Sequence, residues 1–158
     1  MSKDQDIVIV DAVRTPVGNF SGGLSSLTGA QLGAEVIKSL LARNKLAATD
    51  VNEVIMGQVL TAAAGQNPAR QAAIQAGLSN ESTAYTINQV CGSGLRSVAE
   101  GMKSIRNGDS TIVIAGGQES MSQAPHAMQL RNGVKMGNGT MTDTMITDGL
   151  WEAFNNYH

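Results

Sequence analysis

One cysteine has the clearest chemical potential in this sequence. Cys91 is the only cysteine among 158 residues and lies in the motif NQVCGSGL at 88–95. A short apolar run at 84–87 precedes the motif and a helical pattern follows it, so we expect Cys91 where a strand turns into a helix. The first turn of a helix favours thiolate over thiol, and Gly92 and Gly94 leave room for a thioester beside the sulfur. The pattern predicts a nucleophile that carries an acyl group.

Four motifs, in the same order along the chain, resemble those of the thiolase family. They are DAVRTP at 11–16, GQNPARQ at 65–71, NQVCGSGLR at 88–96 and GGQESMS at 116–122. The resemblance extends from about residue 6 to the last residue and covers the N-terminal portion of a thiolase. Within the family the chain is most similar to the acetoacetyl-CoA type, because VKMG at 134–137 and DGL at 148–150 recur there.

The resemblance implies an acetyl-CoA C-acetyltransferase, which is an acyltransferase. Cys91 would take an acetyl group from acetyl-CoA, and a second acetyl-CoA would attack it to give acetoacetyl-CoA and CoA. The reverse reaction is thiolysis. Coenzyme A thioesters are then substrates, and we expect no cofactor and no metal. By the same resemblance Leu150 and His158 align with the coenzyme A site, and we expect Met136 near it.

Plainer alternatives stay open for each of these residues. A cysteine near an apolar strand is often a small buried hydrophobic residue, Leu150 could be ordinary core, and His158 could be a frayed chain end. Ser93 lacks the Gly-x-Ser-x-Gly spacing of a hydrolase nucleophile, so we expect it to cap or pack. We expect Asn88 to orient the strand end and Glu119 to be structural.

The elements around the cysteine predict an α/β fold. Four apolar runs predict strands of a parallel sheet, at 7–10, 54–56, 85–89 and 111–115. Three helices are expected, from the capping-box residue Thr28, from Asn67 with Pro68 behind it, and from Cys91 to Gly108. The apolar stripe of the third helix is Leu95, Val98, Ala99, Met102 and Ile105. The alternation predicts a layered βαβαβαβ domain.

The character of the sequence changes near residue 121. Five of the eight methionines lie from Met121 onward, and a Met-rich, loop-rich segment is typical of adaptable packing or an interface. We expect 1–120 to be the N-terminal thiolase α/β domain without its last strand, and 121–158 to begin the loop domain. The resemblance also implies an oligomerisation hairpin at 131–137 that contacts another subunit.

Composition argues against several classes of partner. The net charge is −2 with both signs scattered, so we expect neither nucleic acid nor a membrane surface. No apolar stretch approaches the ~20 residues of a membrane span. The charged first residues lack the apolar core of a secretory signal. A single cysteine forms no intrachain disulfide, which fits a cytoplasmic protein.

The resemblance also implies that further catalytic groups lie outside this sequence. They are a histidine in a Gly-His-Pro motif, an Asn-Glu-Ala-Phe motif and a second cysteine. A helix N-terminus stabilises a negative charge by only about 0.3–1 kcal/mol, so we expect an efficient nucleophile to need an imidazole as well. Neither His126 nor His158 has a clear claim to that role. We therefore expect a split thiolase, a hetero-oligomer whose second polypeptide carries the C-terminal half; a fragment of a longer chain is the alternative.

Two other functions remain as alternatives. A ketoacyl synthase-type condensing enzyme has a cysteine at the same kind of junction, with its acyl donor commonly on a carrier protein. A non-catalytic binding or assembly subunit would keep the fold without turnover.

Overall fold

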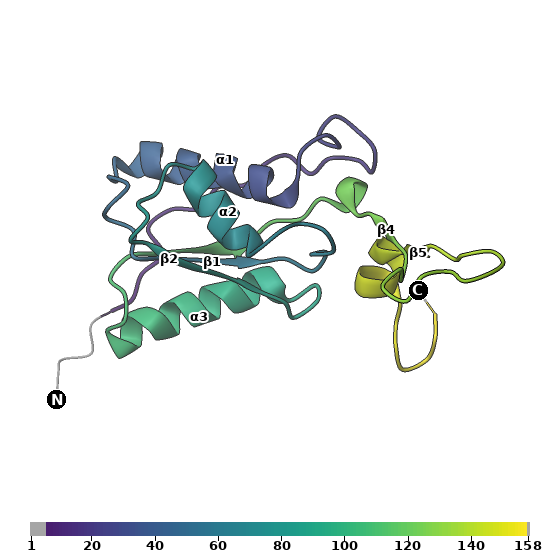
Figure 1. The fold of residues 1–158 in the computed structure, drawn as a ribbon. Helices are drawn as coiled ribbons and strands as arrows, with labels where there is room; N and C mark the ends of the chain where they lie inside the picture. Colours follow the sequence, from purple (N-terminus) through teal and green to yellow (C-terminus); the bar gives the residue numbers. More distant parts are fainter. Residues whose placement is uncertain (1–5, 158) are drawn as a thin grey trace.

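Three parallel strands form the larger sheet of the structure. The computed structural model describes residues 6–157. The strands are β1 (Glu53–Gly57), β2 (Thr83–Ile87) and β3 (Val113–Gly117), in the spatial order β2-β1-β3 (Figure 1). Both outer strands run parallel to β1, and Ile55 lies opposite Tyr85 and Ala115. The carboxyl ends of all three strands therefore meet at one end of the sheet.

Helices cover both faces of this sheet. The first two, α1 (Gly29–Asn44) and α2 (Pro68–Gln75), lie on one face, and α3 (Ser93–Asn107) lies on the other (Figure 1). The main hydrophobic core lies between α1, α2 and β1, where Ile37 and Val54 are completely buried. A central strand buried on both faces is typical of a parallel sheet. The predicted α/β layered fold is confirmed.

The first two helices begin where the sequence predicts. The Thr28 hydroxyl accepts a hydrogen bond from the Gln31 N–H at 3.2 Å, and the Gln31 side chain accepts one from the Thr28 N–H at 2.8 Å. These two bonds form the expected capping box. The Asn67 side chain caps α2 by accepting from the Arg70 N–H at 3.2 Å, with Pro68 in the first turn. Local side-chain chemistry therefore fixes both helix starts.

The apolar run at 7–10 is not a strand, contrary to the prediction. Val8, Ile9 and Val10 are 68%, 79% and 80% exposed. Among residues 6–157, no strand pairs with this run, and the outer edge of β3 is also without a neighbour. An apolar segment becomes a strand only where a partner offers its backbone groups, since strand propensity depends on context. The described domain therefore begins with α1 rather than with a strand.

The third helix packs on the sheet through small residues rather than through its apolar stripe. Ser93, Ser97 and Gly101 are its buried positions. Leu95 and Met102, which we expected to face the core, are 79% and 38% exposed. A Cβ atom at Gly101 would lie 3.1 Å from a methyl group of Val113. The helix axis is thus too close to β3 for large side chains to fit between them.

The last part of the chain lies beyond the carboxyl ends of the strands (Figure 1). Its elements are short: η1 (Met121–Gln123), β4 (His126–Ala127), β5 (Thr142–Asp143) and η2 (Ile146–Leu150). β4 and β5 pair antiparallel, and the expected hairpin at 131–137 lies in the loop between them. The Asn-Gly turn in this loop forms, because the Gly133 N–H donates to the Leu130 carbonyl at 3.0 Å. The domain boundary near residue 120 and the subunit contact stay predictions.

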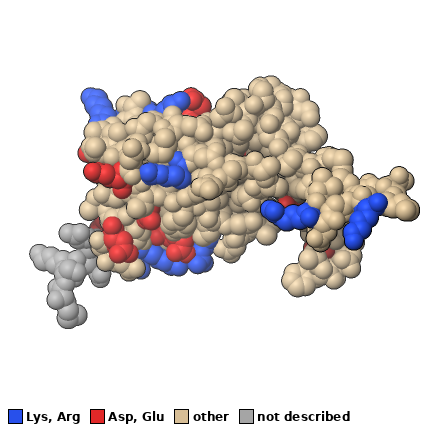
Figure 2. Space-filling model, viewed as in Figure 1, with Lys and Arg blue, Asp and Glu red and all other residues tan. Residues whose placement is uncertain are grey.

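Charged side chains of both signs are interspersed on the surface seen in Figure 2. This distribution agrees with the small net charge of −2. A search of residues 6–157 finds no helix with the length and apolar character needed to cross a membrane.

Candidate nucleophile site

Cys91 lies in the five-residue connection between β2 and α3, at residues 88–92. This connection leaves the carboxyl end of β2, the side of an open parallel sheet at which ligands usually bind. The cysteine is exposed, so the alternative of a buried packing cysteine is wrong. The predicted strand-to-helix position is confirmed, although β2 ends at Ile87 rather than at Gln89.

The residue before the cysteine has a strained backbone. Val90 has a φ of 49°, in the left-handed region. A β-branched residue there is a genuine outlier, and such strain costs about 1–3 kcal/mol. The Asn88 side chain helps to hold this conformation by accepting a hydrogen bond from the Val90 N–H at 2.8 Å. Asn88 thus orients the strand end, as expected.

A buried hydroxyl completes the support of this turn. Ser93 is 4% exposed. Its Oγ accepts a hydrogen bond from the Gln89 N–H at 2.8 Å and donates one to the Val90 carbonyl at 2.5 Å. The serine therefore bonds to the two residues that precede Cys91 from the first turn of the helix that follows it.

Glycines let the start of α3 sit directly on the sheet. A Cβ atom at Gly57, the last residue of β1, would lie 2.4 Å from the carbonyl carbon of Ser93 and 2.6 Å from the nitrogen of Gly94. A Cβ atom at Gly117 would lie 3.4 Å from the Gly94 Cα. No side chain fits between these backbones. The helix start, and with it the Cys91 turn, is fixed against two strands.

The histidine that the structure describes belongs to another part of the molecule. The Nε2 atom of His126 lies 3.8 Å from an Asp143 carboxylate oxygen, across the β4–β5 pair. Among residues 6–157, no group of three or more histidine, cysteine or acidic side chains is arranged to hold a metal ion. The thiol of Cys91 takes part in no hydrogen bond with any residue in this range. The described residues thus offer a nucleophile without a base.

The loop after β1 is tied to the segment that follows β3. The Glu119 carboxylate accepts hydrogen bonds from the Val59 and Leu60 N–H groups at 2.8 and 3.0 Å, so its role is structural, as expected. The Gln118 amide donates to Gln58 at 2.9 Å, and Gln58 donates to the Leu60 carbonyl at 2.8 Å. Gln58 and Leu60 line a pocket of about 200 Å³ at the carboxyl end of the sheet.

The predicted coenzyme A residues lie in or beyond the last segment. Leu150 ends η2 and is 45% exposed, and Met136 is 93% exposed in the loop between β4 and β5. His158 lies outside the described residues. A Cβ atom at Gly149 would lie 3.0 Å from a Leu60 methyl group, so η2 packs against the loop after β1. This contact places η2 at the same end of the sheet as the Cys91 turn (Figure 1), while the roles of the three residues stay predictions.

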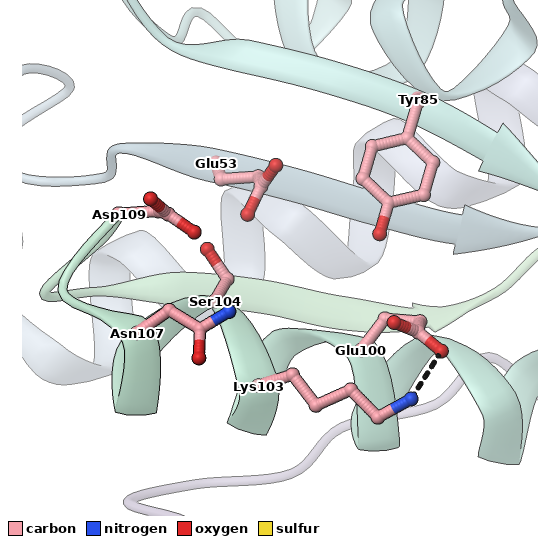
Figure 3. Close-up of a pocket in the computed structure, with 7 residues that line it drawn as sticks. All are labelled: Glu53, Tyr85, Glu100, Lys103, Ser104, Asn107 and Asp109. Carbon is pink, nitrogen blue, oxygen red and sulfur yellow. Dashed lines mark hydrogen bonds and ion pairs between the residues drawn. The ribbon is translucent and has the colours of Figure 1, made fainter.

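A second pocket lies toward the other end of the sheet (Figure 3). It has a volume of about 370 Å³ and three carboxylates in its lining, from Glu53, Glu100 and Asp109. A hydrogen bond from Lys103 holds the pKa of Glu100 below its usual value, with help from the charge of Arg96. Burial and the charge of Glu53 raise the pKa of the Tyr85 phenol in the same pocket. Because the Glu100 carboxylate is already paired with two cations, we assign this pocket no catalytic role.

Two features of the nucleophile site escaped prediction from sequence. The positive φ of Val90 has no sequence signal, since valine normally avoids that conformation. The close approach at Gly57 has only a weak one, a glycine at the end of an apolar strand.

Comparison with known proteins identifies the family to which this chain is similar. Residues 7–158 match the family model described as "Thiolase, N-terminal domain". The chain is 58% identical to an acetyl-CoA acetyltransferase of Allochromatium vinosum, over 98% of this chain and 40% of that protein. It is 58% identical to one of Paracoccus denitrificans, over 96% and 39%. It is 55% identical to one of Pseudomonas aeruginosa, over 98% and 39%. The chain thus spans about two fifths of the length of these relatives.

Proposed function

Because the chain belongs to the thiolase family, whose N-terminal domain it carries, we propose that Cys91 is the acyl-accepting nucleophile of an acetyl-CoA acetyltransferase. The observation that carries the proposal is the placement of an exposed thiol on a strained turn, directly ahead of a helix fixed to the sheet. The same match favours a thiolase over a ketoacyl synthase-type enzyme. The names of the relatives support an acyltransferase that acts on acetyl-CoA.

In the first half-reaction the Cys91 sulfur attacks the thioester carbon of acetyl-CoA. The carbonyl oxygen becomes an oxyanion, which the backbone N–H of Cys91 helps to hold, together with a second amide from outside this chain. The carbon–sulfur bond to coenzyme A then breaks. An imidazole from outside this chain takes the Cys91 thiol proton as the sulfur attacks and passes it to the leaving coenzyme A thiolate, and the acetyl group stays on Cys91.

In the second half-reaction a base removes a proton from the α-carbon of another acetyl-CoA. The resulting carbanion attacks the acetyl carbon on Cys91, a carbon–carbon bond forms, and the Cys91 thiolate leaves. Acetoacetyl-CoA is the product, and thiolysis is the same sequence in reverse. Every reacting group is a thioester, a thiol or a proton, so the proposed chemistry uses coenzyme A thioesters as substrates and no cofactor.

The base and the imidazole come from outside this chain in our proposal. Support comes from residues 6–157, where His126 is engaged with Asp143 and Cys91 has no basic partner. We propose that a second polypeptide supplies these groups and that the active species is a hetero-oligomer. Leu150, Met136 and His158 would contact the coenzyme A moiety, as the resemblance implies.

Native mass spectrometry of the purified protein, with and without acetyl-CoA, tests this function. We expect a co-purifying second polypeptide and an acetyl adduct that maps to Cys91. A Cys91→Ala variant is the control and should take up no acetyl group. If the wild-type assembly takes up none either, the catalytic proposal is wrong; if the adduct forms without a second polypeptide, the split arrangement is wrong.

A further inference from the structure

We propose that Ser93 is a positioning residue for the Cys91 nucleophile, and this inference rests on the proposed function. Its hydroxyl would hold the strained turn that presents the thiol to the thioester. A serine near the start of a helix usually caps that helix. Ser93 instead bonds backward to the residues ahead of the cysteine, and the cap residue of α3 is Gly92.

The two bonds of Ser93 act on both sides of one peptide group. The Oγ accepts a hydrogen bond from the Gln89 N–H and donates one to the Val90 carbonyl. It therefore holds the backbone both before and after Val90, the residue in the left-handed conformation. Val90 has this positive φ although its side chain is 53% exposed. Two side chains bond to this turn, the Asn88 carbonyl oxygen and the Ser93 hydroxyl, and Ser93 is the buried one of the two. Backbone bonds from the Gly92 N–H to the Gln89 carbonyl at 3.0 Å and from the Ser93 N–H to the Val90 carbonyl at 3.1 Å add to them, so the Gln89 N–H is the group that depends on the Ser93 hydroxyl alone.

Ser93 can act as a fixed point because its backbone is packed directly against the sheet. A Cβ atom at Gly57 would lie 2.6 Å from the Ser93 Cβ, so the serine is pressed against the end of β1. A Cβ atom at Gly94 next to it would lie 3.8 Å from the Gly117 Cα on β3. A turn bonded to this point takes its position from the sheet rather than from solvent-exposed loop residues.

Position matters more for acyl transfer than for simple alkylation. Attack on a bound thioester requires the sulfur within reach of one carbon and along one direction, and a 1 Å misplacement can cost about 10²-fold. Iodoacetamide approaches from free solution and demands no such alignment. A turn that has lost its support should therefore lose acetyl transfer while the thiol stays reactive toward iodoacetamide.

The chain offers a matched control for this test in Ser97. It is a completely buried serine one turn further along α3, and the carbonyl oxygens of Gly94 and Gly116 lie 2.6 and 2.7 Å from its Oγ and share its single hydroxyl proton. Ser97→Ala removes a buried hydroxyl with two hydrogen bonds from the same helix but leaves the Cys91 turn intact. The two variants should be similar in stability and differ in acetylation.

The experiment measures Cys91 acetylation and alkylation rates in the assembled enzyme. For Ser93→Ala we expect acetylation to fall about tenfold or more while iodoacetamide labelling changes less than about threefold. For Ser97→Ala we expect both rates to stay within about threefold of wild type. The inference is overturned if Ser93→Ala acetylates like wild type, if its two rates fall together, or if Ser97→Ala loses as much acetylation. Wild-type protein that takes up no acetyl group would instead refute the proposed function.

A second measurement uses the wild-type protein alone, so it tests the inference even if the Ser93→Ala variant does not fold. Gln89 is an exposed loop residue whose N–H donates to the buried Ser93 Oγ. In hydrogen exchange of the wild-type protein we expect this amide to be protected despite its position. An amide of Gln89 that exchanges at the rate of an open loop would refute the support we assign to Ser93.

Discussion

Replacing Gly33 by alanine should destabilise the protein, although alanine favours helices. Gly33 lies in α1, and a Cβ atom there would fall 2.0 Å from the Oε1 atom of Gln118. That distance is far below any real contact between a carbon and an oxygen. Gln118 is 6% exposed, so its side chain cannot turn out into water.

The magnitude follows from what Gln118 must give up. Its amide nitrogen donates to Gln58, and moving the side chain breaks that buried bond at a cost of about 1–3 kcal/mol. If α1 moves instead, it meets overpacking of about 1–3 kcal/mol, because Ala72 of α2 already lies 3.2 Å from the new Cβ. Alanine recovers about 1 kcal/mol of helix propensity. Either cost of about 1–3 kcal/mol less this gain of about 1 kcal/mol leaves a net loss of up to about 2 kcal/mol.

Urea denaturation of wild type and variant provides the assay, with Gln118→Ala as the partner of a double-mutant cycle. In the Gln118→Ala background the clash with Oε1 is absent, so Gly33→Ala should lose much less stability there than in the wild-type background. The difference between the two backgrounds isolates the contact. Equal effects in both backgrounds, or a wild-type background that gains stability, would refute the packing described between α1 and Gln118.

Three further predictions concern the helix starts and one surface carboxylate. Gly57→Ala should reduce Cys91 acetylation about tenfold or more, because the new Cβ would meet the Ser93 backbone at 2.4 Å; an unchanged rate by mass spectrometry contradicts this. Thr28→Ala should lower the free energy of unfolding by about 0.5–2 kcal/mol in urea denaturation. Thr28→Ser keeps the capping hydroxyl and should lower the free energy of unfolding much less. The folded-state pKa of Glu100 lies below its ordinary value of 4.5, so its stabilising contribution is present above that pH and is lost as the pH falls through the folded pKa. In Glu100→Gln the free energy of unfolding should therefore fall less steeply as the pH is lowered. A pH dependence identical to that of wild type would exclude the assigned pairing with Lys103.

Sequence chemistry predicted those parts of the fold that are decided locally. Thr28 and Asn67 cap helices because their side chains reach N–H groups three residues away, and such distances are fixed within one turn. The strand at the centre of the sheet was predictable because Val54, Ile55 and Met56 are apolar without alternation. The position of Cys91 between a strand and a helix was also predictable from local sequence, because an apolar run precedes it and a helical pattern follows it.

What could not be predicted depends on residues far away along the chain. The run at 7–10 has the composition of a strand, but composition does not supply the neighbour that a strand needs. Leu95 belongs to an apolar stripe, yet glycines at the ends of β1 and β3 bring α3 so close that only small side chains fit beneath it. The geometry of the Cys91 turn likewise depends on Gly57, thirty-four positions earlier in the sequence.

The bonds between residues 118–119 and the loop after β1 also have a mechanical consequence. The Gln118 N–H donates to the Gly57 carbonyl at 2.9 Å, its side chain bonds to Gln58, and Glu119 accepts two further N–H groups from Val59 and Leu60. All of these bonds join two short stretches of chain, so a force that pulls the last segment away from the sheet loads them together. Such an arrangement resists shear far better than bonds that open one after another. The junction should therefore be rigid. Because Ser120, Ser122 and Gln123 are also hydrogen-bonded to the segment at 21–27, the Met-rich segment should bend only after residue 123 rather than at the sheet.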